Sequence, residues 1–96
     1  MRPSEALPMH REKIRQLVIE AGMSNPRVFG SVVHGDDIDG SDLDILVDPS
    51  PTTSLMDVAG LQIEIEKLVD VKVDLLTPRA LPIQFKEKVL SEAQPV

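Results

Sequence analysis

Two aspartates, Asp42 and Asp44, stand two residues apart where an apolar run begins that continues to Val47. In a β-strand successive side chains point to opposite faces, so both carboxylates would share one face, roughly 6.5 to 7 Å apart along the backbone. Two like charges placed side by side destabilise a strand unless something neutralises them. Magnesium does this with oxygen ligands and takes further ligands from water and substrate phosphates. The pair therefore predicts a metal site that acts on a phosphate compound.

Gly30 and Ser31, which follow a short apolar run, would supply the other half of this site. Glycine lets backbone N–H groups approach an oxyanion closely, and the serine hydroxyl can donate a hydrogen bond as well. A helix that begins at Ser31 would also point its positive end at the anion. Ser41, directly before the aspartate pair, is either a turn or cap residue or a further residue of the nucleotide site.

Asp74 is the candidate for a third carboxylate. Phosphoryl transfer between two metal ions needs enough anionic ligands for both ions and a group near the attacking oxygen. Asp74 lies inside the apolar run from Val71 to Leu76, where an unpaired charge would be costly to bury. We therefore predict that it is a metal ligand, and the alternative is a polar residue on an exposed strand face.

Together, Gly30-Ser31, Gly35 and Ser41-Asp42-Leu43-Asp44 resemble the signature of the polymerase-beta superfamily of nucleotidyltransferases. The small size of the chain is similar to that of the minimal nucleotidyltransferases of bacteria and archaea, many of which act as antitoxins beside a small helical partner. The resemblance extends from Arg27 to about Ala93. It also agrees with Asp74 as the third acid, because that acid lies in the middle of a later strand in the family.

This resemblance implies an enzyme that transfers a nucleoside monophosphate, foremost AMP from ATP, to a hydroxyl with the help of two Mg²⁺ ions. Asp42 and Asp44 would bind the ion that bridges the triphosphate and would share the second ion with Asp74, which orients or deprotonates the hydroxyl. Gly30 and Ser31 would hold the β and γ phosphates. The implied acceptor is a protein, such as a tyrosine of a HEPN-type toxin. A second copy of the chain is the other partner that we consider.

His34 stands where many relatives of this kind carry arginine, in the pattern Gly-Ser-x-x-Arg-Gly. A neutral imidazole supplies less constant positive charge than a guanidinium group. His34 is therefore either close to the phosphates or a surface histidine on a short helix. The difference motivates an alternative function, in which a catalytically weak or inactive domain neutralises a helical partner by binding alone.

Composition and motifs argue against several other classes of protein. The net charge of −6 and the absence of Trp and Tyr disfavour binding to nucleic acid. A calcium loop around Asp36, Asp37 and Asp39 fails at both end positions, so we expect these acids to form a solvated loop. Neither a P-loop nor a dinucleotide-binding glycine motif occurs. No cysteine and no long apolar run are present, so we expect a cytoplasmic protein that does not enter a membrane.

The periodicity of apolar residues predicts the elements that position these groups within one domain, residues 1–96. Residues 1–8, with two prolines, are expected to be irregular. Phe85, Val89 and Ala93 at fourfold spacing, with Leu90 beside them, predict the last helix. Ser54 and Asp57 predict a helix N-terminus. The fold class is α/β (α+β), a small mixed sheet of three or more strands flanked by helices, with helices at 9–21, 31–35, 54–69 and 82–93 and strands at 27–29, 42–47 and 71–76.

Overall fold

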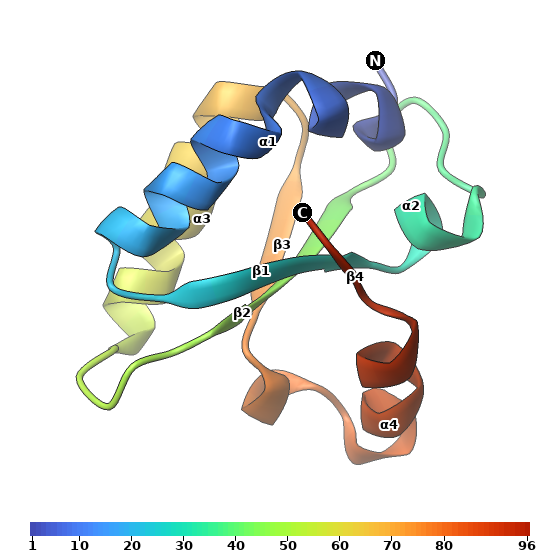
Figure 1. Cartoon of the computed structure of the whole chain (residues 1–96). Coiled ribbons are helices and arrows are strands. Elements are labelled where there is room, and N and C mark those ends of the chain that lie inside the picture. Colours follow the sequence, from blue (N-terminus) through green and yellow to red (C-terminus); the bar gives the residue numbers. More distant parts are fainter.

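The computed structural model describes residues 1–96, which form a four-stranded mixed sheet with helices on both sides (Figure 1). The strand order is β3-β2-β1-β4; β1 runs antiparallel to both of its neighbours, and β2 and β3 are parallel. In chain order the elements are α1 (Pro3–Glu20), β1 (Ser24–Phe29), α2 (Ser31–His34), β2 (Leu43–Asp48), α3 (Leu55–Val69), β3 (Val73–Leu76), the 3₁₀ turn η1 (Pro78–Ala80), α4 (Ile83–Glu92) and β4 (Gln94–Pro95).

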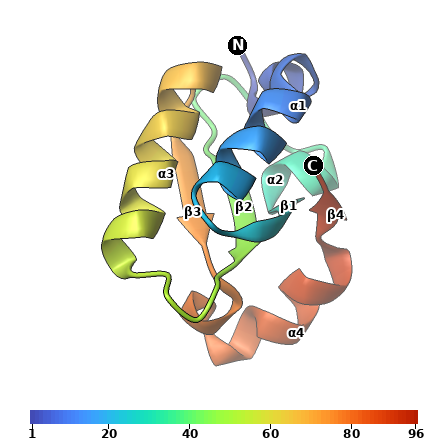
Figure 2. The same cartoon turned by 60° about the vertical axis from the view of Figure 1, so that its left-hand side comes forward.

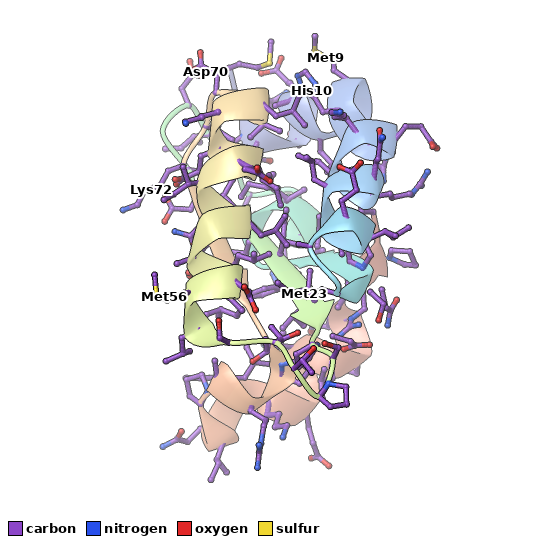
Figure 3. The ribbon with its side chains drawn as sticks, turned by 90° about the vertical axis from the view of Figure 1, so that its left-hand side faces the viewer. Met9, His10, Met23, Met56, Asp70 and Lys72 are labelled. Atoms are coloured by element: carbon purple, nitrogen blue, oxygen red, sulfur yellow. The ribbon has the colours of Figure 1, made fainter.

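The long helices α1 and α3 pack side by side on one face of the sheet, while α4 lies on the other side (Figures 1 and 2). Figure 3 looks onto the face that these two helices cover. The core between helices and sheet is aliphatic, and alternate residues of β2 and β3 enter it: Leu43, Ile45, Val47, Val73 and Leu75. Because side chains alternate along a strand, Asp44 and Asp74 point to the opposite face. No helix is both long and apolar enough to cross a membrane.

The first helix begins at Pro3, so the prediction that residues 1–8 are irregular was wrong. Pro3 occupies the first helical position, where its missing N–H has no partner within the helix in any case. Ala6 and Leu7 are buried together with Ile14 and extend the apolar stripe towards the N-terminus. The helix ends at Glu20, and Gly22 follows with φ +81°, as the predicted stop requires.

The remaining strands and α3 agree closely with the periodicity. Strand β1 begins at Ser24 instead of residue 27, and its register against β2 shifts between Ser24 and Arg27, where Asn25 has φ 53°. Helix α3 begins as predicted: the Ser54 hydroxyl accepts a hydrogen bond from the Asp57 N–H (3.1 Å), and Asp57 Oδ2 accepts one from the Ser54 N–H (2.9 Å). These reciprocal bonds satisfy two N–H groups that a helix terminus otherwise leaves free.

The C-terminal region differs most from the prediction. Helix α4 forms where we expected it, but its apolar positions do not reach the core: it buries no side chain, and Phe85 is 58% exposed. The chain then adds β4 to the sheet, which the sequence did not predict. Val96 is buried, its N–H donates to the Pro26 carbonyl (3.0 Å), and its carbonyl accepts from Arg15 Nε (2.7 Å).

Candidate active site

Asp44 and Asp74 lie directly opposite one another in the parallel pair formed by β2 and β3. Both belong to the sheet face that α1 and α3 do not cover, because their neighbours Leu43, Ile45, Val73 and Leu75 fill the core on the other side. Asp42 lies one residue before β2 begins, and its negative charge is close enough to act on the Asp44 carboxyl. The structure therefore brings Asp44 and Asp74 together on one face of the sheet, from two adjacent strands, with Asp42 just before the start of β2.

The charges of these acids are not balanced by nearby basic side chains. None of the ion pairs and none of the side-chain hydrogen bonds of the structure includes Asp42, Asp44 or Asp74. Burial of the Asp44 carboxyl, together with the negative charges of Asp74 and Asp42, raises its pKa to about 6. A cation held at this face would remove the repulsion between the three acids.

The chemistry of these donors fits magnesium, which prefers carboxylate oxygens and open positions for water and phosphate. Their geometry is open. No three His, Cys, Asp or Glu side chains gather tightly enough to form a metal cage by themselves. Nor does any of the hollows on the surface include an acid of this face; the largest, about 670 Å³, runs along α1. The acids thus form an open site, with Asp42 and Asp44 half-buried and Asp74 exposed, that a substrate or a partner would have to complete.

Gly30 places the predicted phosphate-binding turn directly against Asp44. Its backbone has φ 75° and ψ −144°, which L-amino acids with a side chain rarely adopt. A Cβ atom at this position would lie only 2.3 Å from Asp44 Oδ2. The preceding residue, Phe29, is also the partner of Asp44 in the ladder between β1 and β2. Helix α2 begins at Ser31, as predicted, so the turn and the acids meet at one end of the sheet.

Two further predicted residues have partners within the chain. The Ser41 hydroxyl accepts a hydrogen bond from the Ile38 N–H (2.9 Å), which supports its interpretation as a turn residue, and its contact to a nucleotide stays a prediction. His34 Nε2 lies 2.7 Å from Glu92 Oε2 of α4. Glu92 could not be predicted as a partner of His34, because no motif links a residue of the last helix to the turn after β1.

We expected the acidic loop between α2 and β2 to be solvated, but two of its three aspartates have partners within the chain. Asp37 is buried, and its Oδ2 accepts a hydrogen bond from the Ser4 N–H (2.8 Å), which lowers the pKa of the Asp37 carboxyl. Asp39 forms an ion pair with the N-terminal amino group (2.7 Å). Only Asp36 lacks such a partner. Helix α1 begins earlier than predicted, and this explains the difference: its first turn supplies Ser4 to Asp37, and the residues before it bring the amino group of Met1 to Asp39.

The raised pKa of Asp44 leads to a prediction about stability. Between about pH 4 and pH 6 the folded chain keeps a proton on Asp44 that the unfolded chain has lost, so the contribution of this group to stability falls as the pH rises. Asp44→Asn should therefore raise the free energy of unfolding by about 1 to 2 kcal/mol near pH 7, after a discount for solvent screening, and by little near pH 4. Urea denaturation without divalent metal, at both pH values, measures this difference. A difference that does not change with pH would contradict the explanation.

Comparisons with known proteins agree with this arrangement. A family model described as polymerase beta, nucleotidyltransferase matches residues 12–96. The chain is 31% identical to a candidate protein adenylyltransferase of Methanocaldococcus jannaschii, MJ0435, over 86% of the chain and 89% of that protein. It is 34% identical to the protein adenylyltransferase MntA of Thermococcus cleftensis, over 90% and 84% of the two chains.

Solved structures give the same result. A structure described as a candidate minimal nucleotidyltransferase superposes with a TM-score of 0.86 at 39% identity, over 97% of this chain and 95% of the other. A toxin–antitoxin structure with AMP-PNP has a TM-score of 0.74 at 23% identity and covers 88% of this chain and 69% of the other, which shows a shared fold.

The fold and these matches define the class of this protein as a nucleotidyltransferase. The matched region contains the Gly30-Ser31 turn and the three acids of the open face. The chain belongs to the polymerase-beta nucleotidyltransferase family, and its fold is that of the minimal members.

Proposed function

We propose that this protein transfers AMP from ATP to a hydroxyl group of a partner protein, with magnesium held at the face of Asp42, Asp44 and Asp74. The observation that carries the proposal is the pairing of Asp44 with Asp74 across β2 and β3, with the Gly30 turn packed against Asp44. The named protein adenylyltransferases among the relatives support the nature of the transferred group.

Each residue has a role in this proposal. Asp42 and Asp44 would hold one magnesium ion, and Asp74 would join them in holding a second. When bound, magnesium neutralises the triphosphate and favours ionisation of the acceptor hydroxyl. Gly30 and Ser31 receive the β and γ phosphates through backbone N–H groups and the serine hydroxyl. Asp74, the one exposed acid of the three, would orient the acceptor and take up its proton.

The reaction is a single displacement at phosphorus. The acceptor oxygen forms a bond to the α-phosphorus as the bond from that phosphorus to the oxygen of the leaving pyrophosphate breaks. The proton of the hydroxyl passes to Asp74, and the products are the AMP-modified acceptor and pyrophosphate. Catalysis therefore depends on positioning and on neutralisation of charge, which the chain provides without a covalent intermediate.

The proposed acceptor is a small helical toxin of the HEPN type, so the protein would act as an antitoxin. One neighbour of the same fold is a Shewanella oneidensis antitoxin in complex with a tri-AMPylated HEPN toxin, and this supports the proposal. The site of Asp42, Asp44 and Asp74 is open, and none of the surface hollows includes these acids. An open site of this kind fits a macromolecular acceptor better than a small molecule that a pocket would enclose. Since the reaction consumes ATP, we place it in the cytoplasm.

The test incubates the protein with ATP labelled at the α-phosphate, magnesium and the product of the adjacent gene. We expect label on the partner with the wild-type chain, and a loss of about a hundredfold or more with Asp42→Asn or Asp44→Asn, since each removes a metal ligand. Transfer that survives both substitutions would contradict the proposal.

A second candidate function is neutralisation by binding alone. The observation that favours it is His34, which replaces the usual arginine and is already engaged with Glu92. In this case the wild-type chain would bind and neutralise its partner without label transfer, and Asp42→Asn and Asp44→Asn would leave that binding unchanged. The same experiment therefore separates the two functions.

A further inference from the structure

Helix α4 is attached to the rest of the molecule through very few side chains. It buries none of its own side chains, and Ile83, Phe85 and Leu90 are exposed. Apart from a bond within the helix, the single side-chain hydrogen bond that α4 makes joins Glu92 Oε2 to His34 Nε2, at 2.7 Å. His34 is therefore joined to α4 by a single side-chain hydrogen bond.

This contact lies next to the turn that is proposed to hold the triphosphate. His34 is the last residue of α2, a helix of four residues that starts at Ser31. Just beyond Glu92 the chain enters β4, where Gln94 pairs with Val28, two residues before Gly30 (Figures 1 and 2). Strand β1 and the Glu92 carboxylate thus hold the two sides of the Gly30-Ser31 turn.

We infer that Glu92 is a positioning residue for ATP: it holds the His34 imidazole and, through it, the short helix α2 and the Gly30-Ser31 turn. This inference rests on the proposed role of that turn in binding phosphate. Both side chains of the pair are partly exposed, 44% for His34 and 37% for Glu92, and such pairs contribute little to folding stability. The effect of Glu92 should therefore appear in affinity for ATP instead of in unfolding.

The experiment compares Glu92→Ala with Glu87→Ala, which removes the same charge from an exposed position of the same helix that has no partner. Calorimetric titration with MgATP needs no acceptor. We expect Glu92→Ala to raise the Kd for MgATP about fivefold to tenfold and Glu87→Ala to leave it within about twofold, the range of a single lost positioning contact. Thermal unfolding midpoints of the two variants should be alike.

A double-mutant cycle tests whether Glu92 acts through His34. If it does, Glu92→Ala should have no further effect on the Kd in a His34→Ala background. Independent, additive effects would overturn the inference, as would a Kd for Glu92→Ala equal to that of the wild type or a lowered unfolding midpoint that Glu87→Ala does not share. These results would leave the proposed function standing if the wild type still transfers label. Failure of the wild type to bind MgATP would instead contradict the proposed function.

Discussion

Replacing Gly30 with alanine is expected to reduce label transfer about a hundredfold or more, through displacement of a proposed metal ligand. The new Cβ would lie 2.3 Å from Asp44 Oδ2, so the carboxylate must move away from the position that it occupies beside the Gly30 turn. The backbone at φ 75° adds strain, and we expect the free energy of unfolding to fall by about 1 to 3 kcal/mol. Label transfer is measured at a temperature at which the variant is folded. Urea denaturation at the same temperature verifies this and gives the free energy of unfolding.

Gly22→Ala is the matched control, because Gly22 also has a positive φ, +81°, but a Cβ there would meet no atom within 4 Å. It should lose stability and keep its activity. The substitution Asp44→Ala removes the clashing oxygen, so the double variant Gly30→Ala/Asp44→Ala should be less destabilised than the sum of the two single variants. Additive stability effects, or full activity of Gly30→Ala, would show that the turn does not press on Asp44.

Asp74→Asn is expected to cause a loss of transfer of about a hundredfold or more, without loss of stability, because it removes both a proposed ligand and the acceptor of the proton. Asp74 is exposed and has no hydrogen-bond partner that the fold needs. Removal of its charge should also lower the pKa of Asp44, since Asp74 is the larger of the two charge effects on that carboxyl. Label transfer and NMR titration of the Asp44 carboxyl measure the two effects.

The control for Asp74→Asn is Asp70→Asn, a substitution with the same change of charge shortly before β3. Asp70 ends α3 in the left-handed conformation, φ 56°, which asparagine adopts readily. Its side chain lies at the end of that helix (Figure 3). Asp70→Asn should retain transfer. Equal losses in both variants would indicate a general effect of charge and would count against Asp74 as a ligand.

The sequence allowed the prediction of those parts of the fold that local patterns determine. The capping residues Ser54 and Asp57 located the start of α3, and the alternation of β2 and β3 placed Asp44 and Asp74 on the face opposite the core. The Gly30-Ser31 turn followed from residue type alone, since its backbone conformation is one that glycine adopts at little cost. In each of these cases the physical cause lies within a few residues of the feature.

Features that depend on contacts between distant residues were missed. The N-terminal helix begins at Pro3 because Ala6 and Leu7 are buried in the core and the Ser4 N–H donates a hydrogen bond to Asp37. The residues that bury Ala6 and Leu7, like Asp37, are distant in sequence. Strand β4 forms through its pairing with β1. The contact of Glu92 with His34 likewise requires that α4 and α2 lie close together in the fold. Helix α4 has an amphipathic pattern, yet the pattern could not tell that the apolar side chain of Phe85 stays exposed.

The most direct test of the account is a crystal structure of the protein with Mn²⁺ in place of magnesium and a non-hydrolysable ATP analogue. We expect anomalous scattering peaks between the carboxylates of Asp42, Asp44 and Asp74, with the β and γ phosphates at Gly30 and Ser31. A metal bound elsewhere, or a carboxylate of Asp74 that points away from those of Asp42 and Asp44 when the nucleotide is bound, would contradict the account.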